Sequence, residues 1–211
     1  MTEPARLPRY HFDRALLLGY AAGSLPEGLA ILVATHLSLC PACRAADPRF
    51  VDPRAAGGVA PESGLESGLE SGLESGQEGG DGLLPPPLRA YLGDALESLD
   101  WQPLAPGVES TPLRPARSAA AGAWPPGVEV ALVRLAPGAS APRHSHAGIE
   151  ATVIVQGGFA DDNGSYERGD AWIVDARITH TPVGLPGEGC LCLVYLDGPL
   201  KPANDTHVAS I

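Results

Sequence analysis

Long apolar runs are missing from this sequence. No segment approaches the roughly 20 consecutive apolar residues that a helix needs to cross a bilayer. Residues 1–9 are polar and contain two prolines, so they do not form the apolar core of a signal peptide. We therefore expect a cytoplasmic protein that makes no contact with a membrane.

Positive charge is scarce. The chain has 14 Lys and Arg residues against 25 Asp and Glu residues, which gives a formal net charge of −11. Because the phosphates of nucleic acids would repel such a chain, the composition argues against direct binding to DNA or RNA. A protein partner fits the charge better than a nucleic acid does.

Cysteine is also scarce, with four residues in the chain. In a reducing compartment such cysteines are more often metal ligands or buried thiols than disulfides. Gly and Pro, by contrast, are abundant, with 26 and 22 residues. This abundance favours turns, linkers and short strands over long helices.

Residues 1–50 have the pattern of a small helical domain. Asp13 can cap a first helix, which Gly23 ends. Ser24, followed by Pro26, predicts the start of a second helix with Ser24 near its N-cap. A domain of this size cannot build a stable core alone, so it needs a metal ion or another staple.

Residues 51–87 have the composition of a linker rich in Gly, Ser, Glu and Pro. Glu-Ser-Gly-Leu occurs three times in succession from Glu62. Such low-complexity sequence favours disorder. The alternative is a helix with Leu65, Leu69 and Leu73 on one face, which would order only on a partner because each Gly disfavours a helix by roughly 1 kcal/mol.

Residues 88–211 have the pattern of an all-β domain. Residues 88–101 predict a short amphipathic helix or, as the alternative, an entry segment to the domain. After them the chain shows closely spaced apolar strands separated by Gly and Pro. This spacing is typical of a sandwich or barrel. The clearest predicted strands are Val128–Leu135, Glu150–Val155, Ala171–Val174 and Cys190–Leu196.

The helical part contains a candidate zinc site. His36 and Cys40 are four residues apart, so on a helix their side chains share one face. Pro41 then lets the chain turn and brings Cys43 back to the same point. Thiolates and imidazoles suit Zn2+, which takes four tetrahedral ligands in structural sites. His11, at the start of the first helix, is the predicted fourth ligand.

An alternative for Cys40 and Cys43 is a redox Cys-x-x-Cys pair. Such pairs usually lie at a helix N-terminus, where the helix dipole lowers the pKa of the thiol. Here the pair is expected at a helix C-terminus, with His36 one turn before it. The sequence therefore favours zinc over redox chemistry.

The β part contains a second candidate metal site. On a strand, His144 and His146 point to the same face because they are two residues apart. Glu150 returns after the next bend, and His180 lies eleven residues after Gly169 on a later strand pair. Three imidazoles and a carboxylate inside a barrel would bind a divalent ion such as zinc, manganese, iron or nickel. The alternative is a pair of exposed histidines on a strand.

Other polar residues in the β part have less specific patterns. Cys190 and Cys192 alternate with leucines, so we expect small buried residues on one face of the barrel. A thiol pair that faces the metal cavity and responds to oxidants is the alternative. Asp161, Asp162 and Asp170 are expected to be turn residues, which leaves no separate acid/base pair for catalysis.

The N-terminal residues resemble a known family. His11, His36, Cys40 and Cys43, together with Tyr-Ala-Ala-Gly-Ser-Leu at 20–25, resemble the zinc-binding anti-sigma domain. The resemblance is strongest to the ChrR-type anti-sigma factors, which carry a C-terminal cupin. It implies a small all-α zinc-binding domain followed by an all-β cupin (jelly-roll) barrel.

The β part resembles the two cupin motifs. The first motif matches at Gly138, His144, His146, Glu150 and Gly157. The second motif keeps a glycine and a histidine, at 169 and 180. It departs from the family at positions 175, 177 and 184, where Asp, Arg and Gly replace the usual Pro, Gly and Asn.

The resemblance implies an anti-sigma factor that is not an enzyme. Its helical domain would bind and inhibit a sigma factor of the extracytoplasmic-function type, and its cupin would sense oxidative or singlet-oxygen-type stress. The family normally has a further amphipathic helix after the zinc ligands, where this chain has its Glu-Ser-Gly-Leu repeats. The alternatives are a metal-dependent cupin enzyme, such as a dioxygenase or isomerase, and a cupin sensor without a sigma partner. The oligomeric state stays open.

Overall fold

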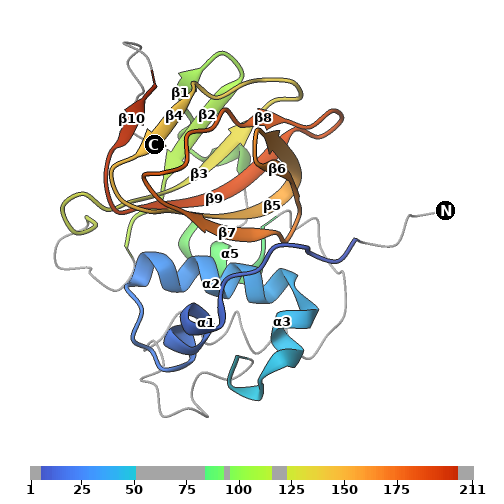
Figure 1. Cartoon of the computed structure of the whole chain (residues 1–211), viewed down its shortest axis with the longest axis vertical. Coiled ribbons are helices and arrows are strands. Elements are labelled where there is room, and N and C mark those ends of the chain that lie inside the picture. The colour runs from blue at the N-terminus through green and yellow to red at the C-terminus, as the bar shows by residue number, and fades with distance from the viewer. Residues whose placement is uncertain (1–5, 51–83, 93–95, 116–122, 204–211) are drawn as a thin grey trace.

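The computed structural model describes residues 6–50, 84–92, 96–115 and 123–203. A layer of helices lies against one side of a β-barrel, and helix α2 runs along the sheet (Figure 1). The helices are α1 (Arg14–Ala21), α2 (Glu27–Leu39), α3 (Pro41–Ala46) and α5 (Pro86–Leu92), with short 3-10 turns at Pro48–Phe50 and Leu96–Ser98. Within the described ranges no helix combines the length and the apolar character that a membrane crossing requires.

The first helix follows the sequence pattern, whereas the start of the second does not. The Asp13 side chain accepts a hydrogen bond from the backbone N–H of Leu16 at 2.7 Å, so Asp13 is the N-cap of α1 as predicted. The prediction that Ser24 lies near the N-cap of α2 is wrong. Pro26 occupies that position without a side-chain cap, and the hydroxyl of Ser24 donates instead to the carbonyl of Gly19.

The strands form one large antiparallel sheet and a separate ribbon. The large sheet has the order β1-β2-β3-β9-β5-β6, and β7 and β8 also pair with β5. The ribbon consists of β4 and β10. The strands are β1 (Gln102–Ala105), β2 (Val108–Pro112), β3 (Glu129–Leu135), β4 (His144–His146), β5 (Glu150–Asp161), β6 (Gly164–Glu167), β7 (Ala171–Val174), β8 (Val183–Gly184), β9 (Cys190–Leu196) and β10 (Leu200–Pro202).

Strand β5 is longer than the sequence predicts. The sequence predicts a strand over Glu150–Val155, but the strand continues to Asp161. Gly157 adopts a φ of +59° and lies so close to the neighbouring backbone that a Cβ would stand 2.1 Å from the carbonyl oxygen of Gly189. The glycine thus permits a bend within the strand, and the second half of β5 pairs with β6 and β8.

The remaining predicted elements are largely present. Strands β7 and β9 have the predicted bounds, and β3 begins one residue later than expected. The predicted helix within residues 88–101 is wrong in extent. Helix α5 spans Pro86–Leu92, because the prolines supply its first turn, and the next described element is a 3-10 turn at Leu96–Ser98.

Helix α2 and the sheet share one hydrophobic core. Leu29 and Leu32 of α2 belong to the same buried cluster as Val130 and Tyr195 of the barrel. The helix approaches the sheet closely at Gly28, where an added Cβ would lie 2.8 Å from the ring of Tyr195. The helices therefore use the barrel as the second half of their core.

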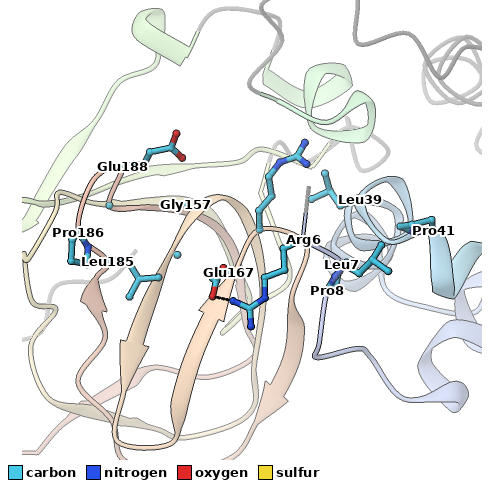
Figure 2. A pocket seen from close by; sticks show the side chains of 13 residues that line it. Arg6, Leu7, Pro8, Leu39, Pro41, Gly157, Glu167, Leu185, Pro186 and Glu188 are labelled. Atoms are coloured by element: carbon cyan, nitrogen blue, oxygen red, sulfur yellow. Dashed lines mark hydrogen bonds and ion pairs between the residues drawn. The ribbon is translucent and has the colours of Figure 1, made fainter. Parts of the chain in front are cut away.

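The predicted boundaries at residues 50 and 87 remain predictions. The Glu-Ser-Gly-Leu repeat, with Leu65, Leu69 and Leu73, lies outside the described residues. A pocket of about 440 Å3 opens between the helical part and the barrel (Figure 2). Pro8 and Leu39 line it on the helical side, and Arg6 makes an ion pair with Glu167 of the barrel across it.

Two candidate metal centres

The structure brings the four predicted residues of the helical part together. One ligand atom from each of His11, His36, Cys40 and Cys43 lies within 4.8 Å of the others. Nδ1 of His11 lies 3.5 Å from Sγ of Cys40 and 3.4 Å from Sγ of Cys43, and Nε2 of His36 lies 3.3 Å from Sγ of Cys43. We call this group the helical centre.

Two consecutive helices position these side chains. His36 lies in the last turn of α2, and Cys40 is both the C-cap of α2 and the N-cap of α3. Pro41 is the first residue of α3 rather than part of a simple turn, since its missing N–H is not needed there. The Cys-x-x-Cys pair therefore lies at a helix N-terminus as well, which corrects the expectation that placed it only at a C-terminus.

The electrostatics of the helical centre fit a metal ligand set. Burial lowers the pKa of His36 to about 4, so its imidazole is neutral at physiological pH. Nδ1 of His36 lies 2.8 Å from the carbonyl oxygen of Gly169 and donates to it, which leaves the lone pair of Nε2 facing the thiols. Burial, together with Cys40, raises the pKa of Cys43 to about 12. That direction is opposite to the lowered pKa of a reactive redox thiol.

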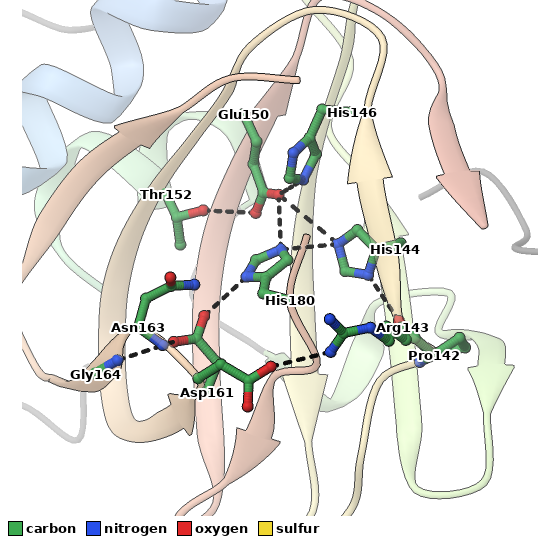
Figure 3. Close-up of polar contacts among 11 residues, drawn as sticks. Pro142, Arg143, His144, His146, Glu150, Thr152, Asp161, Asn163, Gly164 and His180 are labelled. Carbon is green, nitrogen blue, oxygen red and sulfur yellow. Dashed lines mark hydrogen bonds and ion pairs between the residues drawn. The ribbon is translucent and has the colours of Figure 1, made fainter. Parts of the chain in front are cut away.

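The structure also brings the four predicted residues of the β part together (Figure 3). Oε2 of Glu150 lies 2.5 Å from Nε2 of His146, 3.6 Å from Nε2 of His180 and 3.9 Å from Nε2 of His144. The side chains come from β4, from the start of β5 and from His180, which forms a β-bridge with His144. All four are buried. We call this group the barrel centre, and the alternative of exposed histidines is wrong.

Several buried polar atoms of the barrel centre have no hydrogen bond. These atoms are both ring nitrogens of His146 and Oε2 of Glu150. The short distance between Nε2 of His146 and this oxygen therefore lacks the geometry of a normal hydrogen bond. Leaving such groups unpaired costs about 1–3 kcal/mol each. A cation between the four side chains would satisfy Oε2 of Glu150 and one ring nitrogen of His146, so the residues fit a divalent metal ion.

Hydrogen bonds behind the ligands fix their orientation. Nδ1 of His180 lies 2.9 Å from a carboxylate oxygen of Asp161, and Nδ1 of His144 lies 2.7 Å from the carbonyl oxygen of Pro142. The hydroxyl of Thr152 donates to Oε1 of Glu150 at 2.9 Å. These contacts direct Nε2 of both histidines, and one oxygen of Glu150, toward the centre.

The charge states of Glu150 and His180 in the barrel centre depend on two opposing effects. Burial favours the neutral form of each group, and neighbouring side chains favour the charged form. Burial raises the pKa of Glu150, but the imidazoles of His144, His146 and His180 around its carboxylate outweigh burial and hold the pKa well below its ordinary value. For His180, burial favours the neutral ring, yet the carboxylates of Asp161 and Glu150 raise the pKa to about 9. The site thus carries an ionised carboxylate, and uptake of a metal ion would displace the proton of His180.

The expectation for the acidic residues was incomplete. Asp162 is exposed and pairs with Arg143, and Asp161 accepts turn hydrogen bonds from Asn163 and Gly164. Asp161 is in addition the partner of His180, which the sequence analysis missed. No local signal marks this role, because the contact joins the end of β5 to a residue 19 positions further on.

A small cavity of about 70 Å3 adjoins the barrel centre. Its lining is mostly apolar, from residues such as Val133, Leu135 and Phe159, with His144 and Glu150 also on its wall. Cys192 lines it too, and both Cys190 and Cys192 are 3% exposed. Both thiols are therefore buried, as predicted. The volume of the cavity admits only a small ligand.

Comparison with known proteins finds similarity along most of the chain. Residues 94–200 match the family described as the ChrR cupin-like domain. The chain is 36% identical over 208 residues to the anti-sigma-E factor ChrR of Cereibacter sphaeroides, which covers 92% of each protein. The anti-sigma ChrR in its crystal structure with Rhodobacter sphaeroides SigE is 33% identical, with a TM-score of 0.67 over 89% of this chain and 98% of that chain. The expected fold class, a helical part followed by a cupin barrel, is confirmed.

Proposed function

This chain belongs to the ChrR family of cupin-containing anti-sigma factors, and we propose that it inhibits a sigma factor of RNA polymerase. The partner would be a sigma factor of the extracytoplasmic-function type, bound in the cytoplasm by the helical part. The proposal involves no direct binding to nucleic acid and no binding to a membrane. The barrel would be the sensor that ends the inhibition.

One observation carries the proposal. The similarity to anti-sigma factor ChrR covers 92% of both proteins, so it spans the helical part as well as the barrel. A cupin enzyme would need only the barrel, and a match confined to residues 94–200 would have left the helices without a function. The solved ChrR chain is in complex with SigE, which makes a sigma factor the partner to test.

We propose Zn2+ as the ion of the helical centre. Two sulfurs and two imidazole nitrogens suit its tetrahedral preference, with His11 binding through Nδ1 and His36 through Nε2. When bound, zinc supplies folding free energy rather than chemistry. The ion would join the start of α1 to the junction of α2 and α3. The protein itself would supply all four donor atoms.

The barrel centre would hold a divalent ion through His144, His146, Glu150 and His180. Three nitrogens and one oxygen are compatible with zinc, manganese, iron or nickel. When bound, the ion supplies a Lewis acid with free coordination positions. The adjoining cavity of about 70 Å3 has room for a small oxidant rather than for a sizeable substrate.

A sensing barrel fits the site better than a catalytic one. The carboxylate of Asp161 is committed to His180 and that of Glu150 to the centre itself. Among the described residues that line the cavity, Glu150 is the one with a carboxylate. The described residues that line the cavity therefore include no general acid or base separate from the metal ligands. A site that responds to a signal without turnover does not need one.

Purification of the full chain from its own cells tests the proposal. We expect a sigma factor to co-purify in equal amount, and the purified chain to stop transcription that depends on that factor. Transcription by RNA polymerase with its housekeeping sigma factor is the control and should continue. Recovery of the chain without any sigma factor, under conditions that keep its metals bound, would favour the enzyme or the partner-free sensor.

A further inference from the structure

We propose that the barrel turn at residues 168–171 holds both histidines of the helical centre, so that the barrel sets how firmly this centre retains its ion. The inference rests on the proposed zinc site of the helical part. It adds a physical route by which a change in the barrel reaches the residues that would bind the sigma factor. The route consists of three sets of contacts.

The first contact concerns His36. Its ring is fully buried, and Nδ1 donates to the carbonyl oxygen of Gly169 at 2.8 Å. An imidazole that binds a metal through one nitrogen is oriented by the partner of the other nitrogen. Here that partner is a backbone carbonyl of the barrel, 133 residues further along the chain.

The second set of contacts concerns His11. The residue before it, Tyr10, is fixed to the same turn: the N–H of Ala171 donates to the carbonyl of Tyr10 at 3.0 Å. The carboxylate of Asp170 accepts from the backbone N–H groups of Arg9 at 2.5 Å and of Tyr10 at 3.1 Å. The chain segment that presents His11 is thus hydrogen-bonded to the barrel.

The third set of contacts connects the turn to the barrel interior. The N–H of Gly169 donates to the carbonyl of Ile154 at 2.8 Å, and the N–H of Ile154 donates to the carbonyl of Asp170 at 3.0 Å. Ile154 lies on β5, the strand that begins with Glu150 of the barrel centre. One strand and its adjacent turn therefore contact both centres.

Close packing makes Gly169 the sensitive position of this turn. Its φ is +87°, and a Cβ added there would stand 2.6 Å from Cγ of Pro8 and 3.5 Å from Cβ of Leu39. Pro8 and Leu39 belong to the helical part and also line the pocket beside the turn (Figure 2). A side chain at 169 would therefore push the helical part off the turn.

The chain offers a matched control for this substitution. Gly187 has a φ of +91°, but nothing lies within 4 Å of a Cβ added there. Gly169→Ala and Gly187→Ala impose the same backbone strain on barrel turns, and the clash with the helical part occurs only at 169. Any difference between the two variants reports the contact with the helical part.

Cobalt(II) is the probe for the experiment. Bound thiolates give cobalt a strong near-ultraviolet absorption, which the nitrogen and oxygen donors of the barrel centre cannot produce. The full chain is loaded with cobalt, and loss of this absorption to excess EDTA gives the release rate. We expect Gly169→Ala to release cobalt about 10- to 100-fold faster than wild type, the usual effect of losing an outer partner of a metal ligand, and Gly187→Ala to match wild type.

Two further variants complete the test. Pro8→Ala removes the atom that the new Cβ would meet, so adding it to Gly169→Ala should restore most of the slow release. Asp170→Asn keeps the shape of the side chain but leaves one acceptor oxygen for three backbone N–H groups, those of Arg9, Tyr10 and Glu167. It should release cobalt several-fold faster, and it decides alone if Gly169→Ala does not fold.

The outcomes separate this inference from the proposed function. The inference would be overturned if Asp170→Asn and Gly169→Ala released cobalt at the wild-type rate, or if Gly187→Ala released it as fast as Gly169→Ala. Either result would leave the zinc site intact. Absence of the thiolate absorption from the wild-type chain would instead remove the zinc site on which the inference rests.

Discussion

The two candidate metal centres are alike in the spacing of their ligands and differ in what orients them. In each centre three ligands lie close together in sequence, at 36–43 and at 144–150, and the fourth, His11 or His180, is distant. The outer partners differ. The barrel centre takes its partners from the barrel itself, at Asp161, Pro142 and Thr152, whereas the helical centre takes its partner from the barrel.

This difference implies that the helical centre depends on the barrel for its assembly. The barrel centre has its ligands and its supporting hydrogen bonds within the strands and turns of the barrel, so it should assemble without the helices. The helical centre lacks such independence, because both the core of α2 and the hydrogen bond of His36 are completed by the barrel. A change in the barrel can therefore reach the helical centre, and by reciprocity an ion bound there would favour the barrel conformation that holds it.

The largest effect is expected from removing the thiols of the helical centre. Cys40→Ser together with Cys43→Ser should abolish sigma binding and most of the helical structure, because structural zinc contributes on the order of 10 kcal/mol to small zinc modules. Circular dichroism and co-purification with the sigma factor measure these losses. The barrel should stay folded and keep its own ion.

Cys190→Ala together with Cys192→Ala is the matched control, because it removes two thiols from the barrel instead. Sigma binding should persist in this variant. Full sigma binding by the protein with both Cys40→Ser and Cys43→Ser would show that the helical centre is not needed to bind the sigma factor. The dependence of this centre on the barrel would then have no bearing on sigma binding.

The next effect concerns the barrel centre. His146→Ala removes a ligand whose ring nitrogens have no other partner, so the barrel should lose its ion. An ion whose free concentration is several hundred times its dissociation constant stabilises the folded state by about 3–4 kcal/mol. Because the variant loses this contribution, the melting temperature of the barrel should fall. Sigma binding should change less than in the thiol variant; complete loss of it would contradict the dependence described above.

A smaller effect is expected at Asp161. Asp161→Asn keeps the size of the side chain but weakens its hold on His180, and should lower the affinity of the barrel centre for its ion by about 10- to 100-fold. Asp162→Asn is the adjacent control, since Asp162 is exposed and bonded to Arg143. Competition with a chelator measures both. Equal affinities in the two variants would show that the contact between Asp161 and His180 has no such role.

The smallest effect is expected from the exposed ion pair across the pocket. Arg6→Ala removes the partner of Glu167, but solvent screens this pair and ion pairs of this kind contribute little. Cobalt release and sigma binding should both be unchanged. A marked loss would mean that surface charge, rather than the backbone contacts at residues 168–171, joins the two parts.

The sequence predicted which candidate ligands come together better than it predicted what positions them. His-x3-Cys-x2-Cys and His-x-His follow the geometry of a helix and a strand, so local spacing was sufficient to group these side chains. The partner of His36 is a backbone carbonyl, which any residue could supply, and the partner of His180 is one aspartate among several in turns. Contacts of this kind depend on the packed structure and leave no local pattern.

The same limit applies to the fold. The bounds of β7 and β9 could be predicted because their apolar runs end at clear turn residues. Strand β5 could not, since Gly157 marks a bend only once the backbone at Gly189 is packed against it. The shared core of α2 and the barrel was also missed, because an apolar helix of a small domain and one that covers a sheet have the same pattern.

Native mass spectrometry of the full chain tests the central claim most directly. We predict two bound ions in the wild-type protein and one in each of two variants, with the zinc lost from Cys40→Ser, Cys43→Ser and the other ion lost from His146→Ala. A wild-type chain that carries no ion after growth in metal-rich medium, or variants that both keep two, would contradict the assignment of two separate centres.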